Sequence, residues 1–435
     1  MKLLYNNDRT GEHAPSWYDA TTDSLRRDSL TKHVDTDVCI IGAGFTGLST
    51  AVELRKQGIS CVVLDAHRVG WGASGRNGGQ LGTGFNMNQI ELEAVLGAPL
   101  AHSLWNIAEK AKQWIIQICD ANGFDIEYQS GIVYALHRNR YVKPLHDYCQ
   151  HLQTKYAYEA LQPLTRQTIR DHVNSGDYYG GAIDHGAGHV HPLKLAHALA
   201  KVAESEGAVI FERSEAIRIQ GASRDTRAQR VVTPTGSVCC QRVVLASNGY
   251  LDSLHDGLNK KLMPINNFIV VTEPLGDVAQ QLLPHNNAAA DSRFVVNYFR
   301  RVAGNRLLFG GGENYSYDFP DTIEPMVRKA MLGVFPQIND AAIDYAWGGT
   351  LAITRNRLPY LAEIGPQQFA AGGYSGHGLA LACIYGKALA NHLAGDSTMF
   401  DVLSQLPNKA FPGTTNLRPL LLTLAMTGYS WLDSV

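Results

Sequence analysis

The sequence has no long apolar run and no large excess of charge. No uninterrupted apolar stretch reaches the roughly 18 residues that a membrane-spanning helix requires, and residues 1–30 are polar, without the apolar core of a signal peptide. Lys and Arg number 38 against 40 Asp and Glu, which gives a net charge of -2. No broad positive field therefore favours a nucleic acid or an anionic membrane. These absences predict a soluble protein with no transmembrane segment and no nucleic-acid partner.

The cysteines show no pattern of disulfides or metal ligands. There are seven of them, an odd number, and none forms a C-x-x-C pair. Cys39 and Cys61 fall in apolar runs, where a reduced thiol acts as a small apolar side chain. His189 and His191 have no third candidate ligand nearby, so we expect no metal. This usage predicts a reducing, cytoplasmic location.

One stretch near the N-terminus carries the strongest pattern in the chain. An apolar run at Val38–Ile41 predicts a buried strand, and the G-x-G-x-x-G turn Gly42–Gly47 follows it directly. Leu48–Gln57 then reads as a helix closed by Gly58, and a second strand follows at Ser60–Leu64. This order of elements predicts a βαβ unit that binds a dinucleotide.

Each glycine of this turn has a physical role in such a unit. Gly42 permits the tight turn, Gly44 lets the backbone approach a pyrophosphate, and Gly47 lets the helix pack closely on the strand. The pyrophosphate would lie on free N–H groups at the helix N-terminus. Asp65 ends the second strand, where a carboxylate can accept a hydrogen bond from a ribose hydroxyl.

A second glycine-rich loop indicates which dinucleotide is bound. Gly70–Gln80 offers several unhindered backbone N–H groups, a hydroxyl at Ser74 and a guanidinium at Arg76. A nicotinamide cofactor has no evident need for such a loop, whereas an extended FAD has. FAD is therefore the expected cofactor.

At these residues the chain resembles the D-amino-acid oxidase (DAO) family of FAD-dependent amine oxidoreductases. Within that family it is most similar to the γ-glutamylputrescine oxidase branch, in which a fingerprint like IIGAGFTGLS is followed by GWGASGRNGGQ. Two later segments extend the likeness: the W-x-G…T-x-x-x-x-P pattern of 347–359 and the glycine turn Gly372–Leu379, which is similar to the family's GFSGHG turn. In the family, that turn meets the flavin.

The resemblance implies an α/β fold (α+β overall). We expect a Rossmann-like FAD-binding domain from residues 1–90, 185–262 and 352–435. An interleaved antiparallel-sheet substrate domain should take 91–184 and 263–351.

Local patterns predict further elements. Residues 90–123 have helical spacing, and strands are expected at Ile126–Gln129 and Gly131–Leu136, joined by a turn at Ser130–Gly131. Another strand is expected at Phe294–Phe299, and an apolar tail over 417–431 predicts a packed helix.

The resemblance also assigns site residues. His377 is a candidate catalytic residue, although it can equally be structural. The expected FAD contacts are Gly42, Gly44, Phe45, Thr46, Gly47, Asp65, Ala66, Arg68, Gly72, Ala73, Ser74, Arg76, Asn77, Gly78, Gly79, Gln80, Ala216, Ser247, Asn248, Gly249, Gly373, Tyr374, Gly376, His377, Gly378 and Leu379.

Three departures from the sarcosine oxidases of this family refine the expectation. Those enzymes follow the G-H-G turn with Phe-Lys, whose Lys binds the substrate carboxylate, whereas this chain has Leu379-Ala380. They tether FAD through a Cys that 347–353 lacks, so FAD should be bound non-covalently. They also carry an oxygen-promoting Lys where this chain has Leu308.

We therefore expect oxidative deamination of a small-molecule amine, γ-glutamylputrescine or a similar γ-glutamyl-polyamine, to an aldehyde, ammonia and hydrogen peroxide. Molecular oxygen or another electron acceptor would reoxidise the flavin. The alternatives are a dehydrogenase or oxidase of another secondary amine or amino acid, and a non-catalytic flavin-binding subunit. The oligomeric state stays open.

Overall fold

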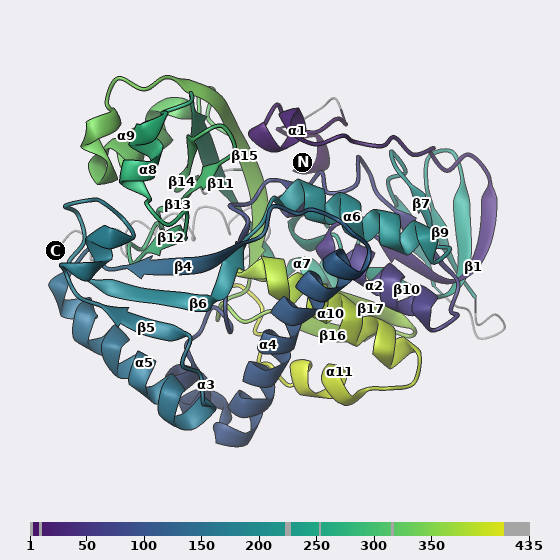
Figure 1. Cartoon of the computed structure of the whole chain (residues 1–435). Coiled ribbons are helices and arrows are strands. Elements are labelled where there is room, and N and C mark those ends of the chain that lie inside the picture. The colour runs from purple at the N-terminus through teal and green to yellow at the C-terminus, as the bar shows by residue number, and fades with distance from the viewer. Residues whose placement is uncertain (1–2, 8–10, 222–227, 252–253, 315–316, 413–435) are drawn as a thin grey trace.

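The computed structural model describes residues 3–7, 11–221, 228–251, 254–314 and 317–412. Within them, two β-sheets lie side by side, each with its own helices (Figure 1). The helix expected over 417–431 falls outside the described residues.

The first sheet contains the predicted dinucleotide unit. In the described part of the chain it has eight strands, with the main order β16-β17-β10-β1-β2-β7 and a β8-β9 extension on β10. Neighbours from β17 to β7 are parallel, and the carboxyl-terminal parts of the central strands, Val38–Ile41 of β1 and Val243–Leu245 of β10, are apolar and buried. The strands are β1 (His33–Ile41), β2 (Cys61–Leu64), β7 (Val209–Phe211), β8 (Arg218–Gln220), β9 (Gln229–Val232), β10 (Ser237–Leu245), β16 (Tyr360–Gly365) and β17 (Gln368–Gly372).

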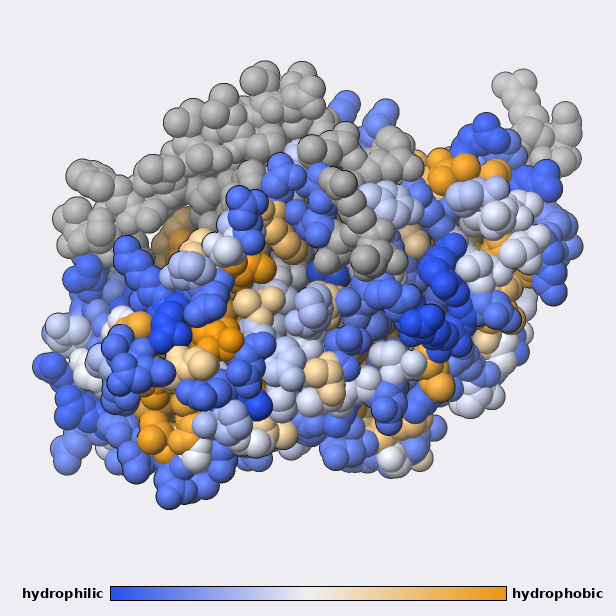
Figure 2. Space-filling model, turned by 90° about the horizontal axis from the view of Figure 1, so that it is seen from above, coloured by the Kyte–Doolittle hydropathy of each residue, from blue (hydrophilic) through white to orange (hydrophobic). Residues whose placement is uncertain are grey.

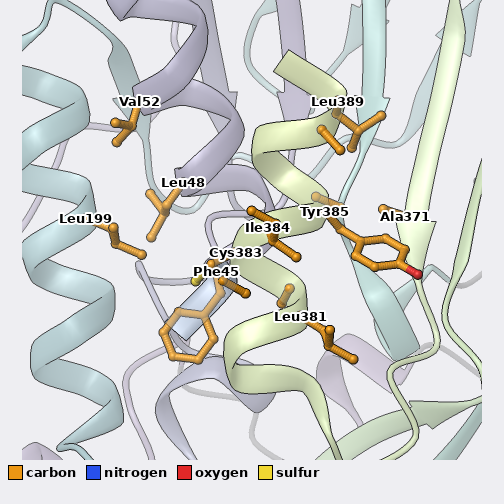
Figure 3. Close-up of a cluster of buried hydrophobic side chains, with 14 of the residues drawn as sticks. Phe45, Leu48, Val52, Leu199, Ala371, Leu381, Cys383, Ile384, Tyr385 and Leu389 are labelled. Atoms are coloured by element: carbon orange, nitrogen blue, oxygen red, sulfur yellow. The ribbon is translucent and has the colours of Figure 1, made fainter. Parts of the chain in front are cut away.

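Helices cover one face of this sheet and form its core. They are α2 (Phe45–Lys56), α4 (Ala98–Ala121), α6 (Pro192–Ser205) and α10 (Gly378–Leu393). Figure 3 shows α10 lying between α2 and β17, with Leu48 of α2 and Ile384 of α10 in the same apolar cluster. Close packing is possible because Gly386 of α10 lies where a Cβ would come within 2.3 Å of the Thr46 carbonyl oxygen.

The second sheet is mainly antiparallel and has nine strands among the described residues, with the order β15-β11-β14-β13-β12-β4-β6-β3 and β5 on β6. One pair, β4 with β12, is parallel. The strands are β3 (Gln80–Leu81), β4 (Gln129–Ala135), β5 (Leu161–Leu164), β6 (Gly181–His189), β11 (Met263–Thr272), β12 (Ala288–Asp291), β13 (Tyr298–Val302), β14 (Arg306–Asn314) and β15 (Ile343–Ile353).

Further helices complete the two halves. The remaining α-helices are α1 (Trp17–Ala20), α3 (Gln89–Leu96), α5 (Val142–Tyr156), α7 (Asp256–Asn259), α8 (Asp277–Leu282), α9 (Glu324–Val334) and α11 (Thr398–Leu403). Single 3₁₀ turns occur at η1 (Leu3–Tyr5), η2 (Ala73–Gly75), η3 (Asn139–Tyr141), η4 (Thr168–Asp171), η5 (Asn248–Tyr250) and η6 (Pro336–Ile338).

The α/β fold class and the βαβ unit are confirmed. The strand-helix-strand order appears as β1, α2 and β2, with Gly44 as the N-cap of α2. The helical spacing over 90–123 forms two helices, because Gly97 adopts a φ of 82° between α3 and α4. The division at residues 90, 184, 262 and 351 stays a prediction, and β6 crosses the second of these boundaries.

Two strand predictions are wrong. Ser130–Gly131 does not form a turn; it is a register shift inside the single strand β4. Gly131 takes a φ of 101°, and the Asn287 side chain donates to the Ser130 carbonyl at 3.1 Å from the neighbouring chain segment. The strand expected at Phe294–Phe299 begins only at Tyr298.

Among the described residues, no helix is both long and apolar enough to cross a membrane. The face drawn in Figure 2 is mostly hydrophilic, and its hydrophobic residues lie in separate small groups.

Candidate active site

A cavity of about 730 Å³ lies between the two sheets. On one side it is lined by the turns that follow β1, β10 and β17, so it lies at the carboxyl ends of the parallel strands. On the other side it is lined by side chains of β4, β11, β12 and β13. The cavity is therefore bounded by both halves of the molecule.

The glycines of the first turn lie where a side chain would not fit. Gly42 has a φ of 111°, and a Cβ there would lie 2.7 Å from the Ala246 carbonyl oxygen. At Gly47 a Cβ would lie 1.9 Å from the Gly42 carbonyl oxygen. The role predicted for Gly47, close packing of helix on strand, is confirmed.

Asp65 fixes the shape of this turn. Its Oδ2 accepts a hydrogen bond from the Ala43 N–H at 2.7 Å, and its Oδ1 accepts one from the His67 N–H at 2.9 Å. Burial raises the pKa of this carboxyl to about 6. Asp65 also lines the cavity, so it remains placed for the ribose contact that the sequence predicts.

The second glycine loop is joined directly to the first. The Ser74 hydroxyl accepts a hydrogen bond from the Phe45 N–H at 3.0 Å, at the start of α2. A Cβ on Gly44 would lie 2.8 Å from the same oxygen. Arg76 stacks over the Trp71 ring and donates to the Trp71 carbonyl at 2.6 Å. The contact between Phe45 and Ser74 therefore joins the two loops, and both line the cavity.

The third turn, between β17 and α10, is tied to the first glycine turn and to the turn that follows β10. The Tyr374 and Thr46 hydroxyls are 2.6 Å apart, and the Gly373 N–H donates to Asn248 Oδ1 at 2.9 Å. The turn ends at the N-terminus of α10, where unpaired N–H groups favour a carbonyl or an anion.

His377 lines the cavity, but its unpartnered ring nitrogen is buried against the wall and not exposed to the open space. It is the N-cap residue of α10, and its ring packs so closely on Gly82 that a Cβ there would lie 2.7 Å from Cε1. Within the described residues, its buried Nε2 has no hydrogen-bond partner. Burial, assisted by the charge of Lys112, lowers the pKa of His377 to about 4. The imidazole is therefore neutral at physiological pH and can accept a hydrogen bond.

Most of the expected site residues border this cavity. Those that do are Gly42, Gly44, Phe45, Thr46, Asp65, Ala66, Gly72, Ala73, Ser74, Arg76, Asn77, Gly78, Gln80, Ala216, Ser247, Asn248, Tyr374, Gly376, His377, Gly378 and Leu379. Those that do not are Gly47, Arg68, Gly79, Gly249 and Gly373. Their contact with the cofactor stays a prediction.

Arg68 makes ion pairs within the protein. Its guanidinium donates to Glu212 at 2.8 Å and to Glu12 at 2.6 Å, and its side chain is only 4% exposed. This arrangement makes it part of a buried ion-pair network that holds the N-terminal arm against β7.

His189 and His191 act separately and not as a pair of ligands. His189 Nε2 lies 2.9 Å from the Asn286 carbonyl oxygen, and its Nδ1 faces Arg300. His191 Nδ1 accepts from the Lys194 N–H as the N-cap of α6. Both histidines thus have structural partners.

Sequence patterns did not identify the cavity wall contributed by the second sheet. Its side chains come from separate strands and loops, so no local spacing marks them. The residues in question include Asn86, Ile132, Tyr134, Asn267, Arg293 and Tyr298. Tyr298 donates to Asn267, which fixes its ring against Gly78 and Gly310.

The residues present fit an extended FAD. Glycines keep the backbone of both loops accessible where side chains would collide, and the helix N-termini of α2 and α10 supply N–H donors along one cavity. Asp65 and Ala216 line the cavity where β2 and β7 end, and His377 lines it at the start of α10.

Comparison with known proteins agrees with this fit. Residues 37–392 match the family model described as DAO, FAD dependent oxidoreductase. The chain is 37% identical to the probable oxidoreductase OrdL of Rhizobium meliloti (strain 1021), over 96% of this chain and 97% of that one. It is 33% identical to the gamma-glutamylputrescine oxidoreductase of Escherichia coli (strain K12), over 97% of this chain and 99% of that one.

Solved structures show the same fold at lower identity. Glycine oxidase from Geobacillus kaustophilus superposes with a TM-score of 0.70 at 22% identity, covering 83% of this chain and 95% of that one. An FAD-bound L-alpha-glycerophosphate oxidase from Mycoplasma pneumoniae gives 0.63 at 18% identity, covering 87% and 97%. The family match spans most of the chain and contains the glycine turns and the α10 turn described above. This protein is an enzyme that uses FAD, and it belongs to the DAO family of FAD-dependent oxidoreductases.

Proposed function

We propose that this enzyme oxidatively deaminates γ-glutamylputrescine or a similar γ-glutamylated polyamine. The amine R–CH₂–NH₂ loses two electrons and two protons to give an imine, and water converts the imine to an aldehyde and ammonia. Bound FAD supplies the two-electron acceptor, and oxygen then takes the electrons to give hydrogen peroxide. The gamma-glutamylputrescine oxidoreductase of E. coli, 33% identical over nearly the whole chain, supports this choice of substrate.

The observation that carries the proposal is the residue at the start of α10. Ala380 lines the cavity and is 4% exposed, at the position where sarcosine oxidases hold a Lys for the substrate carboxylate. Because an apolar methyl group replaces that cation, an α-carboxylate at this point would lose its charge-assisted contact. An amine without a neighbouring carboxylate suits this wall better.

His377 has a role that its environment supports. Its ring lines the cavity and is neutral, so it can contact the amine without placing a second positive charge beside it. Such a contact would orient the substrate. The ring itself is held by its close packing on Gly82.

The cofactor would be held without a covalent bond. The backbone of Gly42–Gly44, the start of α2 and the loop around Ser74 would bind its diphosphate. No cysteine belongs to the part of the cavity lining that the structure describes. Residues 1–90, 185–262 and 352–435 would form the FAD-binding domain, and the intervening segments the substrate domain.

One observation favours a second candidate, a dehydrogenase that passes electrons to another acceptor. Leu308 is fully buried in an apolar cluster and lies away from the cavity, where oxygen-reactive relatives are expected to hold a Lys. Without that cation, reaction with oxygen would be slower than in those oxidases.

Product analysis tests the proposal. Purified enzyme with γ-glutamylputrescine in air should form aldehyde, ammonia and peroxide in equal amounts, with matching oxygen uptake. Substrate loss without oxygen uptake, restored by an artificial acceptor dye, would select the dehydrogenase. If neither condition consumes the substrate, the choice of γ-glutamylputrescine is wrong.

We also propose a cytoplasmic location. The thiols of all seven cysteines are free, including the buried Cys39 and Cys240, which is typical of a reducing compartment.

A further inference from the structure

Three arginines line the described part of the cavity, and two of them are engaged by protein groups. Arg76 donates to the carbonyl oxygens of Trp71 and Gly348. Arg293 forms ion pairs with the carboxylates of Asp177 and Asp291. These two cations therefore already serve the fold.

Arg357 differs from both. It is half-buried and lines the cavity, yet no hydrogen bond or ion pair of its guanidinium is found within the residues that the structure describes. A cation that is partly removed from water without a carboxylate partner attracts an anionic group of a ligand.

The backbone holds Arg357 in a turn that is braced from both sides. Its φ of 65° is in the left-handed region, where an L-residue is strained and glycine is not. The Arg357 N–H donates to the Thr354 carbonyl at 3.2 Å, and the Thr354 hydroxyl donates to the Leu358 carbonyl at 2.6 Å. The Leu358 N–H donates to Asn356 Oδ1 at 3.2 Å. These hydrogen bonds therefore fix the backbone from which the Arg357 side chain extends.

This turn lies beside the turn that carries His377. The Thr354 N–H donates to Ser375 Oγ at 3.2 Å, and the Ser375 N–H donates to the Ala352 carbonyl at 3.0 Å. The acidic residues of the described cavity lining, Asp65 and Glu215, follow β2 and β7 on the opposite side of the first sheet. An anion would therefore meet Arg357 without a competing carboxylate in that part of the lining.

We propose that Arg357 is a substrate-binding residue that takes a carboxylate located away from the oxidised amine. The inference rests on the proposed function, since a γ-glutamylated diamine carries such a carboxylate at its other end. A guanidinium suits this role because its planar donors match the two oxygens of a carboxylate. Arg357 would then set specificity from a segment different from the one that sarcosine oxidases use.

The test compares Arg357→Gln with the matched control Arg355→Gln, which removes an exposed arginine two residues earlier in the same turn. Each protein is assayed with γ-glutamylputrescine and with N-acetylputrescine, which has the same reacting end and no carboxylate. Arg357→Gln should lower kcat/KM for γ-glutamylputrescine by about 10- to 150-fold, chiefly through KM. It should leave N-acetylputrescine within about twofold, and Arg355→Gln should leave both substrates within the same limit. The flavin content of all three proteins should be equal.

An equal loss of activity on both substrates, or a loss of flavin in Arg357→Gln alone, would show that Arg357 serves the cofactor or the fold and overturn the inference. A binding measurement separates this failure from failure of the proposed function. Glutarate, a simple carboxylate probe, is titrated into each holoenzyme while the flavin absorbance is followed. Weaker glutarate binding in Arg357→Gln alone supports the subsite even if wild-type enzyme does not oxidise γ-glutamylputrescine, and equal binding in all three proteins rejects it.

Discussion

The two sides of the cavity are built in different ways. The nucleotide side comes largely from one continuous stretch, 38–80, and its defining contacts use backbone atoms, such as the Ala43 N–H to Asp65 and the Phe45 N–H to Ser74. The facing side uses side chains from β4, β11 and β13, as well as from isolated turns. A wall made of backbone atoms and glycines would suit the diphosphate of FAD, which every FAD-dependent member of the family must hold. Side chains that come from separate segments can instead be substituted one at a time in evolution, so the facing side is suited to determine which substrate is bound.

The sharpest way to break the nucleotide side is to add a side chain to it. In Gly44→Val, a Cβ placed 2.8 Å from Ser74 Oγ and beside the start of α2 should displace the loop and block the diphosphate. We expect purified protein to retain almost no FAD, whereas wild type should be yellow and release intact FAD on acid precipitation.

Gly333→Val is the matched control, because an added Cβ in α9 meets no atom within 4 Å. It should keep its flavin. Stoichiometric flavin in Gly44→Val would show that the dinucleotide has been misplaced.

The start of α10, which lines the cavity just after the β17 turn, should respond in selectivity and not in cofactor content. Because Ala380 offers no cation, an α-carboxylate lacks a contact of roughly 1.5–3 kcal/mol. This corresponds to about 10- to 150-fold in kcat/KM in favour of γ-glutamylputrescine over sarcosine. Ala380→Lys should not improve the polyamine derivative and should shift preference toward small N-methyl amino acids, with flavin content unchanged. Steady-state kinetics with both substrates measures this shift, and a wild-type preference for sarcosine or a D-amino acid would reverse the assignment of this wall.

Acid should destabilise the region around α6, the helix that packs against η2 of the second glycine loop. Burial lowers the pKa of His191, the N-cap of α6, to about 3 in the folded protein. Below pH 6.5, the ordinary pKa of a histidine, the unfolded chain therefore binds one more proton than the folded protein does. The free energy of unfolding is therefore highest above pH 6.5 and falls as the pH is lowered toward 3. For this one group the loss is about 2 kcal/mol between pH 7 and pH 5.

His191→Asn keeps a good N-cap and removes the titration. Urea unfolding at the two pH values should therefore show a smaller loss of stability in this variant than in wild type. His185→Asn, at an exposed position of β6, should behave as wild type. Identical pH dependence in all three proteins would contradict the assignment of His191.

The smallest effect should come from the contact that joins the two glycine loops. Ser74→Ala leaves the Phe45 N–H at the start of α2 without its acceptor, which should cost about 0.5–2 kcal/mol of stability. Thermal unfolding of the two flavin-bound proteins measures it. A larger loss accompanied by release of FAD would indicate that Ser74 also holds the cofactor.

The sequence predicts the nucleotide side well because its signals are local. A strand ends at Ile41, three glycines follow, and a helix begins within a few residues, so one short window contains the whole unit. The same holds for the turn Gly372–Leu379, which joins β17 to α10. Gly47 could even be assigned its packing role, since a close approach of helix and strand is part of the pattern.

Predictions fail where the deciding partner is far away in the chain. Ser130–Gly131 reads as a turn, but a side chain from Asn287 and the neighbouring strand β12 keep it within β4. The partner of Arg68 is also distant in sequence: Glu212 takes its guanidinium, and contact of Arg68 with the cofactor stays a prediction. The facing side of the cavity could not be predicted for the same reason, because its side chains come from strands and loops that are far apart in the chain.

The most direct measurement is anaerobic mixing of the flavin-bound enzyme with single substrates in a stopped-flow instrument. The account predicts that γ-glutamylputrescine bleaches the flavin absorbance completely and far faster than sarcosine or D-alanine at equal concentration. Faster bleaching by sarcosine or D-alanine, or no bleaching by any amine, would contradict it.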